Sequence, residues 1–470
     1  MRITLVYPNF GIGRRSLYFP LGLAYVAAAL RNAGHDITVV DMEGDDLTIG
    51  RAFRLIEESD PRMVGFGGMI TRYGIVRELA RTIRSEMPEA FLMAGNSGAT
   101  TVPGLYLESA GMDAVILGEG ETTSVELAAA LASGSDWRGV PGLAFLDERG
   151  ETAFSPPRAL LGDLDSLPWP ARDLFPLEKY MSSTDHRGRY SRHLEIVASR
   201  GCPYGCVYCY HIYGRTIRRR SPESIVAEAE SLVSAYGMSY TGFPDDLFTS
   251  DRTFVIETCR LLRERLPGIR WSCLGRASSV DREMLRAMRA AGCNWISYGI
   301  ETGSRAMLDR MGRTVTPEQC LAAIEMTREA GIHPEGSFMI GMFGETRETV
   351  EETVEFCRRA DITAPMLFVT PYPGTELFDE AVGKGLIPDL EAYVLTLDAA
   401  DRLLVNLTDM DDRDLISLRR WAVGRIGRNY LLRKPLTRLP AILYRHVSAR
   451  GFSGLRRTLM ELITGLGRRT

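Results

Sequence analysis

The chain has 470 residues and a formal net charge of −4, with 45% hydrophobic and 25% charged residues. This composition is typical of globular proteins and excludes a disordered chain, and the length predicts roughly two to four domains. No stretch approaches the ~20 uninterrupted apolar residues of a membrane span, and no apolar leader ends in a cleavage site. We therefore expect the eight cysteines to be reduced thiols in the cytoplasm.

The first 140 residues alternate short apolar strands with amphipathic helices. The pattern predicts strands over residues 2–8, 36–41, 63–68, 90–95 and 114–118, and helices over residues 20–34, 48–59, 73–87 and 123–133. Such alternation indicates βαβ units and a parallel sheet. Because Gly-rich turns follow several strands, we predict a doubly wound, Rossmann-like α/β domain over residues 1–140 that binds a nucleotide or a cofactor at the carboxyl ends of its strands.

A second series of strand and helix signals follows a proline-rich segment. Residues 141–190 are predicted to be a linker, because the prolines of "DLDSLPWPARDLFPLEKY" exclude a continuous helix. Six strand–helix units over residues 191–385 then predict an open, partial (β/α)6 version of the (β/α)8 barrel. One of its helices is expected to follow the cap Ser221, with Pro222 in its first turn, and to end at Gly237.

Residues 386–470 are predicted to be a helical, basic C-terminal extension. Leu415, Leu418, Ala422 and Ile426 fall on one face of a helix. From Leu418 onward there are thirteen Lys and Arg residues and one acid, so this tail carries +12 and the rest of the chain −16. We interpret the tail as a cap on the acidic body, with peripheral contact to a membrane surface as the alternative. Nucleic-acid binding is disfavoured, because the body would repel phosphates.

Three cysteines fall within eight residues of the stretch "SRGCPYGCVYCYHIYG", which follows the first strand of the predicted barrel. A structural zinc site normally takes four ligands in two separated pairs. Cys202, Cys206 and Cys209 could instead hold three irons of a 4Fe–4S cluster and leave the fourth iron open for a small molecule. Barrels place chemistry on the loops after their strands, which agrees with this position. The other five cysteines are scattered singly, and we interpret them as buried small hydrophobes.

The spacing Cys-x3-Cys-x2-Cys, with Tyr208 before the last cysteine, resembles the radical S-adenosylmethionine superfamily. The resemblance implies that the open iron binds S-adenosylmethionine and that an electron from the cluster cleaves it to a 5′-deoxyadenosyl radical. Similar motifs end later strands, in "FPDDLF", "YGIETGS" and "GSFMIGMFGET". The S-adenosylmethionine contacts implied are Tyr208, Asp245, Asp246, Arg276, Glu301, Gly341 and Gly344. The pair of aspartates replaces the commoner Gly-Gly-Glu, and a surface salt bridge is the alternative role for Arg276.

The front domain resembles the cobalamin-binding domain of cobalamin-dependent radical S-adenosylmethionine enzymes, through "FPLGLAYVAAALRNAGHDITVVD", "MVGFGGMITRYG" and "GEGETTSVELAAAL". A corrinoid across the strand ends would need small residues there. The cobalamin contacts implied are Gly67, Gly68, Met69, Gly95, Asn96, Ser97, Thr100, Gly118, Glu119, Gly120 and Glu121.

Two departures from the cobalamin-binding pattern matter. The loop after the fourth strand reads "GNSGAT" where Gly-Gly-Pro-His-Ala-Thr is usual, and "YPNFGIG" stands where Asp-x-His-x-x-Gly would supply a histidine to cobalt. Cobalt would then lack a histidine on its lower face, with Met69 and Tyr73 as neighbours, although core packing is the alternative for Met69. A degenerate domain that no longer holds cobalamin is the alternative for the whole unit.

Together these features predict a cobalamin-dependent radical S-adenosylmethionine enzyme. The resemblance implies a methyltransferase that acts on an unactivated carbon of a small molecule or lipid, with a flavodoxin or ferredoxin as electron donor. A cyclase, oxidase or rearrangement enzyme, for example on a tetrapyrrole, is the alternative, as is a radical enzyme with an empty front domain. His211 could face the substrate or be an ordinary loop histidine.

Overall fold

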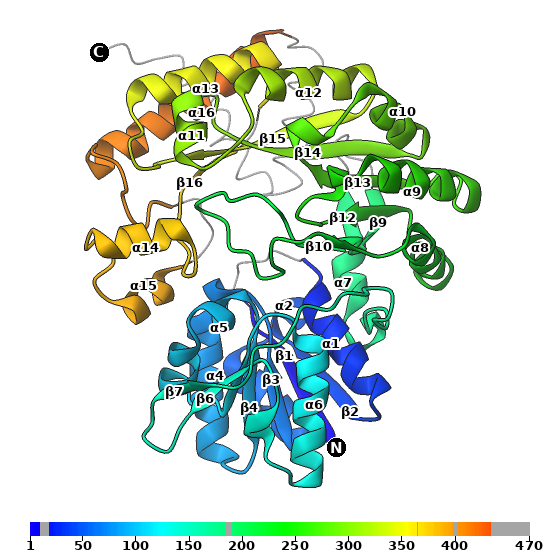
Figure 1. Cartoon of the computed structure of the whole chain (residues 1–470), viewed down its shortest axis with the longest axis vertical. Coiled ribbons are helices and arrows are strands. Elements are labelled where there is room, and N and C mark those ends of the chain that lie inside the picture. Colours follow the sequence, from blue (N-terminus) through cyan, green and yellow to red (C-terminus); the bar gives the residue numbers. More distant parts are fainter. Residues whose placement is uncertain (10–17, 185–189, 364, 398–401, 434–470) are drawn as a thin grey trace.

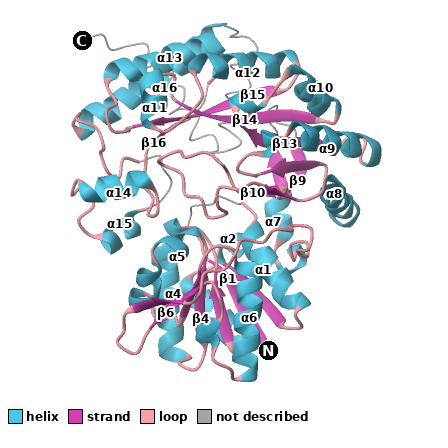
Figure 2. Cartoon of the chain, viewed as in Figure 1, coloured by secondary structure: helices cyan, strands magenta, loops and turns pink. Residues whose placement is uncertain are grey.

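The computed structural model describes residues 1–9, 18–184, 190–363, 365–397 and 402–433. An N-terminal α/β unit lies below a second α/β unit in Figure 1, and two helices drawn in orange, α14 (Glu376–Gly383) and α15 (Leu390–Thr396), lie beside the junction. Figure 2 shows strands at the centre of the lower unit with helices on both sides of them. The predicted α/β fold class is confirmed.

Within the described residues, the front sheet has seven strands in the order β2-β1-β3-β4-β5-β6-β7. Its parallel strands are β1 (Arg2–Tyr7), β2 (Asp36–Asp41), β3 (Met63–Phe66), β4 (Phe91–Gly95) and β5 (Ala114–Ile116). The apolar residues of α1 (Leu21–Asn32) and α6 (Gly120–Ser133) join one hydrophobic cluster on this sheet, and those of α3 (Ile49–Glu58) and α4 (Tyr73–Glu86) join another. The short helices α2 (Met42–Asp45) and α5 (Ser97–Thr101) follow β2 and β4 at the carboxyl edge.

The front sheet extends further along the chain than the sequence predicts. Strands β6 (Leu143–Leu146) and β7 (Thr152–Phe154) pair antiparallel to β5 and to each other, inside the segment predicted to be a linker. Asp147 makes the hairpin turn by accepting the backbone N–H groups of Arg149 and Glu151 at 2.9 Å each. The linker prediction is therefore wrong for these two strands, because the prolines that exclude regular structure begin only after them.

The second sheet is the predicted half-barrel. In the described part of the chain its order is β16-β15-β14-β13-β12-β9-β8. Six strands run parallel: β9 (Tyr190–Glu195), β12 (Tyr240–Phe243), β13 (Arg270–Gly275), β14 (Cys293–Glu301), β15 (His333–Ile340) and β16 (Met366–Phe368). A seventh strand, β8 (Ser182–Thr184), pairs antiparallel with β9 after the short helix α7 (Leu177–Met181), and so adds an edge strand that the sequence does not predict.

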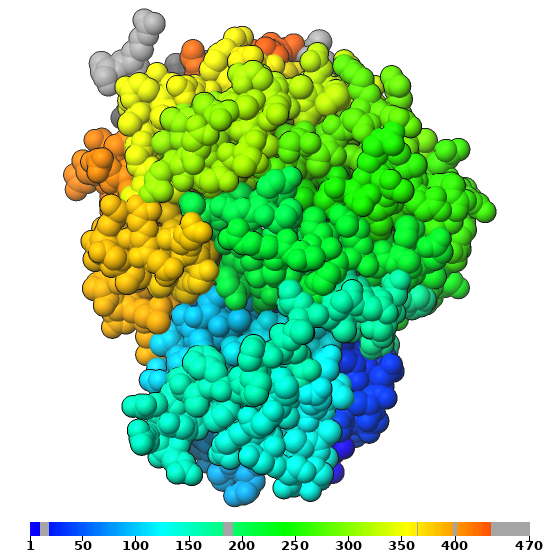
Figure 3. All heavy atoms as spheres, viewed as in Figure 1, coloured from blue at the N-terminus to red at the C-terminus, as the bar shows by residue number. Residues whose placement is uncertain are grey.

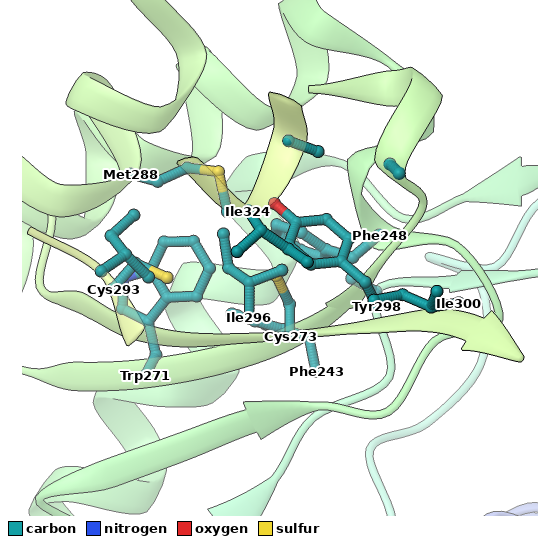
Figure 4. Close-up of a cluster of buried hydrophobic side chains, with 14 of the residues drawn as sticks. Phe243, Phe248, Trp271, Cys273, Met288, Cys293, Ile296, Tyr298, Ile300 and Ile324 are labelled. Atoms are coloured by element: carbon teal, nitrogen blue, oxygen red, sulfur yellow. The ribbon is translucent and has the colours of Figure 1, made fainter. Parts of the chain in front are cut away.

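Helices cover the outer side of the half-barrel. They are α8 (Pro222–Tyr236), α9 (Arg252–Arg265), α10 (Arg282–Ala290), α11 (Arg305–Arg310), α12 (Pro317–Glu329) and α13 (Arg347–Ala360). The start and stop of α8 are as predicted, since Ser221 accepts the N–H of Ser224 and Gly237 adopts φ +64°. Figure 4 shows the core between these helices and the strands, and the rings of Phe243, Phe248 and Trp271 pack against one another within it. All five scattered cysteines are buried, which confirms them as core residues.

The C-terminal helices hold the two units together. Leu415, Leu418, Ala422 and Ile426 are the buried residues of α16 (Asp412–Arg433), as predicted, and they join the core of the barrel. Helix α15 packs against α4 of the front unit, a junction that is continuous on the surface in Figure 3. No helix among the described residues is long and apolar enough to cross a membrane. The predictions for the basic tail over 434–470 fall outside the described residues.

Candidate functional site

A cavity of about 310 Å³ lies at the carboxyl ends of the barrel strands. Its lining includes the three cysteines and residues from five later segments of the barrel, so that the lining as a whole spans residues 202–337. The lining residues are Cys202, Tyr204, Cys206, Tyr208, Cys209, Tyr210, His211, Asp246, Leu247, Leu274, Gly275, Arg276, Ser297, Gly299, Glu301, Arg313 and Ser337. The structure thus brings the sulfur ligands and several predicted cofactor contacts to one place.

At two points the backbone of the cysteine loop is so close to another backbone segment that only glycine fits. The loop runs from β10 (Ser199–Arg200) to β11 (Arg218–Arg219), which pair antiparallel and close it as a hairpin. Gly201 has φ +96°, and a Cβ there would lie 2.4 Å from the carbonyl oxygen of Thr216. Gly312 approaches from the loop after α11, where a Cβ would lie 2.7 Å from the carbonyl oxygen of Gly205. No side chain fits at either position without moving the backbone.

Arg313 sets the electrostatics beside the thiols. Its Nη1 lies 3.9 Å from Cys206 Sγ, 3.2 Å from the Tyr208 hydroxyl and 3.7 Å from Glu301 Oε1. A hydrogen bond from Cys209 and the guanidinium of Arg313 lower the pKa of Cys206, and the same bond with burial raises the pKa of Cys209. Burial also raises the pKa of Cys202. The positive charge therefore favours a thiolate at Cys206.

Four of the seven predicted S-adenosylmethionine contacts line the cavity: Tyr208, Asp246, Arg276 and Glu301. Arg276 is 5% exposed, stacks 3.5 Å from the ring centroid of Tyr204 and donates Nη2 to Thr314 Oγ1 at 2.9 Å. It forms no ion pair with any described residue, so the surface salt bridge is wrong for it. Burial raises the pKa of Asp246.

Glu301 reaches the cavity because β14 is irregular at its end. The register with β15 shifts between Gly299 and Glu301, and Glu301 adopts φ +69°, which is unusual for a residue other than glycine. A Cβ on Gly299 would lie 2.6 Å from Glu301 Oε1, so this turn of the carboxylate requires glycine. Burial raises the pKa of Glu301, and the guanidinium of Arg313 opposes that shift.

The other three predicted contacts lie outside the lining of this cavity. Asp245 is buried and accepts the backbone N–H groups of Ala198, at 2.8 Å, and Ser199, so it fixes the chain entering the cysteine loop. A Cβ on Gly341 would lie 3.5 Å from Leu415 of α16, and Gly344 lines a different cavity beside α16. Both glycines adopt positive φ, so the turn after β15 accounts for them without a cofactor.

The sequence reasoning missed Arg313, Tyr204, Ser297 and Ser337. Arg313 belongs to no motif, and only the approach of its loop to the cysteine loop reveals it. The serines alternate along β14 and β15 on the inward side, a pattern that strand periodicity could have found. His211 lines the cavity, and its buried Nε2 has no hydrogen-bond partner in the described structure.

The donor set fits a 4Fe–4S cluster. Such a cluster takes one thiolate for each iron that the protein holds, and three thiols line one cavity with a guanidinium beside them. Among the described residues no group of three or more His, Cys, Asp or Glu side chains is arranged to hold a single metal ion.

The carboxyl edge of the front sheet carries the predicted cobalamin contacts. Gly118 has φ +73° and open space around it, and its N–H donates to Thr100 Oγ1 at 3.0 Å. Gly95 ends β4, and Ser97 begins α5 with Asn96 as its cap, where Asn96 Oδ1 accepts the N–H of Ala99 at 2.8 Å. The backbone at this edge is therefore ordered by its own polar side chains.

Three glycines of the predicted set are accounted for by packing. Gly67 and Gly120 give clearance to α1, since Cβ atoms there would lie 3.0 Å from Leu23 and 3.2 Å from Val26. Gly68 adopts φ +102°. The backbone of Gly68 favours glycine, and Cβ atoms on Gly67 and Gly120 would crowd α1, whether or not a corrinoid lies above them.

The surroundings of Met69 and Tyr73 in the structure differ from those predicted for them. Met69 is 52% exposed, so core packing is wrong for it. Tyr73 is fully buried and donates its hydroxyl to Glu391 at 2.8 Å, so its side chain does not face the edge. The buried hydroxyl of Thr71 has no partner among the described residues. An exposed apolar side chain, an orphan hydroxyl and the open Gly118 fit a large ligand at this edge.

Glu119 and Glu121 bind the barrel through their carboxylates. Arg200 donates to Glu119 at 2.8 Å and to Glu121 at 2.5 Å, and Arg218 donates to Glu119 at 2.8 Å. These four side chains are at most 8% exposed. Tyr25 of α1 stacks on Arg200 at 5.3 Å. Any cobalamin contact by these two glutamates is therefore expected through the backbone.

Comparisons with known proteins agree with the geometry. The profile of the radical SAM superfamily matches residues 196–357, and that of the B12 binding domain matches residues 12–128. An uncharacterized methyltransferase of Pyrococcus horikoshii is 33% identical over 372 residues, which cover 78% of this chain and 79% of that protein. The anaerobic magnesium-protoporphyrin IX monomethyl ester cyclase of Rubrivivax gelatinosus is 28% identical over 92% of this chain and 79% of its own length.

A solved structure has the same fold. The radical S-adenosylmethionine methyltransferase TsrM from Kitasatospora setae, with cobalamin and a [4Fe-4S] cluster bound, superposes with a TM-score of 0.66 at 23% identity. The match covers 82% of this chain and 75% of that one.

Proposed function

The chain belongs to the radical S-adenosylmethionine superfamily and carries the B12 binding domain of its cobalamin-dependent members, and on this premise we propose that it is a C-methyltransferase. The substrate would be a small molecule or lipid with an unactivated carbon. When bound, the cluster would supply the electron that cleaves S-adenosylmethionine, and cobalamin would supply the methyl group.

The ion network between the two units carries the proposal. Arg200 and Arg218 flank the cysteine loop, and both bind Glu119 at the carboxyl edge of the front sheet. A reaction that uses one group on each unit needs the two units held face to face, because small displacements of reacting groups cost large factors in rate. An enzyme that used the cluster alone would have no such need.

The residues of the cavity have separable roles in this proposal. Cys202, Cys206 and Cys209 would hold the cluster, with Arg313 offsetting the negative charge of the thiolates. Arg276 keeps Nη1 without a partner among the described residues, so it could bind the carboxylate of S-adenosylmethionine. The carboxylates of Asp246 and Glu301 would accept hydrogen bonds from its amino and ribose hydroxyl groups.

Anaerobic reconstitution tests the proposal. Protein produced with iron, sulfide and cobalamin should form 5′-deoxyadenosine after reduction, and should convert reduced cobalamin to methylcobalamin when given S-adenosylmethionine with a deuterated methyl group. Cys206→Ala should abolish 5′-deoxyadenosine formation, whereas Cys357→Ala, which removes a buried thiol of α13, should retain it. Cleavage by Cys206→Ala, or cobalamin that never receives the label, would contradict the proposal.

Cyclisation is a second candidate, favoured by the cyclase of Rubrivivax gelatinosus that aligns with 92% of this chain. Labelled S-adenosylmethionine separates the two reactions once a substrate is found. Methyl transfer leaves the label in the product, whereas a cyclase product carries none.

Two partners belong to the proposal as well. A flavodoxin or ferredoxin would reduce the cluster, because each cleavage of S-adenosylmethionine takes one electron from it. The basic residues 434–470 would either cap the acidic body or rest on a membrane surface. Binding of the full chain to anionic vesicles, compared with a chain ending at residue 433, distinguishes these two roles.

A further inference from the structure

A second cavity, of about 460 Å³, occupies the inner side of the half-barrel. Leu274 and Ser297 line both this cavity and the one that holds the cysteines, so the two are neighbours. Leu274 is 44% exposed although it lies on a central strand, which leaves an apolar side chain free between them. The other lining residues are Tyr18, Ser191, His193, Glu195, Tyr240, Gly242, Phe243, Pro244, Ser272, Cys273, Trp295 and Glu335.

The described residues that line this inner cavity carry negative charge. Among the described residues its lining contains Glu195 and Glu335 and neither Lys nor Arg. Burial lowers the pKa of His193 to about 4, so that histidine is neutral near pH 7. Arg172 reaches the backbone carbonyl of Glu195 at 2.8 Å and the carboxylate of Glu228 at 2.7 Å, but it does not line the cavity. An anionic ligand would therefore meet two carboxylates and no cation among the described residues of the lining.

Two polar groups in the lining lack partners. The buried Nε2 of His193 has no hydrogen bond, and the carboxylate of Glu195 forms no hydrogen bond or ion pair with any described residue. Gly242 of β12 pairs with Glu195 of β9, and a Cβ on Gly242 would lie 3.0 Å from His193 Nε2 and 3.6 Å from Glu195 Cγ. Glycine at this position thus keeps the space between these groups open. Buried polar groups normally have partners, so unpaired ones point to a ligand.

Aromatic rings lie beside these polar groups in the lining. Tyr240 packs edge-on against His193 with ring centroids 5.0 Å apart, and its hydroxyl donates to Asn294 at 2.8 Å. Trp295 donates Nε1 to Glu335 Oε2 at 3.0 Å, which fixes both side chains. Rings beside carboxylates suit ligands that combine an apolar body with a positive or hydrogen-bond-donating end.

We propose that the inner cavity selects the substrate, by holding a cationic or hydrogen-bond-donating end between Glu195, His193 and Glu335 while the carbon to be methylated reaches past Leu274 toward the cysteine cavity. This inference rests on the proposed function and names the substrate class: amines or polyols with an apolar body. Phosphorylated and carboxylate substrates are disfavoured, because the described residues of the lining offer them no cation. Glu195, His193 and Glu335 are specificity residues in this proposal, and they take no part in the chemistry at the cluster.

Binding of matched probes tests the proposal without turnover. Phenethylamine, 2-phenylethanol and 3-phenylpropionate share a ring and differ in charge, and their binding to the anaerobic, cofactor-loaded protein is measured by calorimetry at pH 8. Burial raises the pKa of Glu195 to about 7, so its carboxylate is ionised there. The amine should bind most tightly and the carboxylate least. Glu195→Gln should weaken the amine by roughly tenfold to a hundredfold and leave the alcohol within about threefold.

Controls separate this site from the surface and from catalysis. Glu351→Gln, an exposed residue of α13, should leave the affinity for all three probes unchanged. Leu274→Trp should reduce the binding of every probe by filling the passage. Equal binding of the amine and the carboxylate, or an unchanged amine affinity in Glu195→Gln, would overturn the inference. Because no step depends on cleavage of S-adenosylmethionine, failure of the proposed function would leave these affinities as expected.

Discussion

Removing the guanidinium of Arg200 should destabilise the junction between the two units more than any exposed ion pair could. In Arg200→Met, Glu119 keeps Arg218 at 2.8 Å, but Glu121 loses the arginine that binds it at 2.5 Å. Glu121 is 6% exposed, so its carboxylate would be buried without compensation. Breaking one side of a buried pair typically costs about 3–5 kcal/mol. Because Glu119 keeps its ion pair with Arg218, we expect the loss in the free energy of unfolding to lie near the lower end of this range, at about 3 kcal/mol.

Thermal and urea unfolding of anaerobic protein, with and without cofactors, measure this loss. The double variant Arg200→Met/Glu121→Gln should recover most of it, because the stranded charge is then gone. Arg260→Met is the matched control: Arg260 pairs with Glu264 on the surface of α9, with both side chains more than half exposed, and its removal should cost less than about 0.5 kcal/mol. A loss below about 1 kcal/mol, or a double variant no more stable than Arg200→Met, would refute the reasoning.

Three further changes test the two cavities, the first two at the cysteine cavity and the third at the inner cavity. Arg313→Met removes a positive charge beside Cys206 and should lower the cluster potential by on the order of 50–100 mV in a redox titration, with Arg305→Met on the exposed face of α11 as the unaffected control. Gly299→Ala should displace the Glu301 carboxylate and weaken S-adenosylmethionine binding while iron content is retained, whereas Gly383→Ala in open space should change neither. Equal affinities of the two variants for S-adenosylmethionine would contradict the role given to the irregular end of β14. Glu195 keeps a proton in the fold up to a pKa of about 7 and releases it near 4.5 when unfolded, so its contribution to stability falls as the pH rises through this window. Relative to the unchanged protein, Glu195→Gln should therefore raise the free energy of unfolding by up to about 3 kcal/mol more at pH 8 than at pH 5. Urea unfolding at both pH values measures this difference.

The sequence predicts what is local in the chain. The cysteine motif spans eight residues, and the strand and helix alternation repeats over short windows, so both are readable without tertiary structure. The helix cap at Ser221 and its stop at Gly237 follow from the same local rules. Strand β8 escaped prediction because three residues at a sheet edge carry too little pattern to show.

The parts of the site that the sequence could not provide depend on contacts between distant loops. Arg313 reaches Cys206 only because Gly312 lets its loop approach Gly205, and no motif marks either residue. Glu119 and Glu121 follow a strand of a cofactor-binding domain, which made them natural ligand contacts. Their carboxylates instead bind Arg200 and Arg218. The position of a residue at a strand end therefore predicts where it lies in the fold but does not predict which group its side chain binds.

The same ion network explains why the cysteine loop can be both glycine-rich and well placed. A loop with Gly201 and Gly205 loses more conformational entropy on ordering than one without glycines, so it needs fixed points outside itself. Arg200 and Arg218 fix its two ends to the front unit, and Gly312 contacts its middle from the loop after α11. Variants at the two ends should therefore disturb the geometry between the units before they disturb the cluster. Iron content should persist in Arg200→Met while the ratio of methyl transfer to 5′-deoxyadenosine formation falls, and loss of iron in step with methyl transfer would contradict this division of roles.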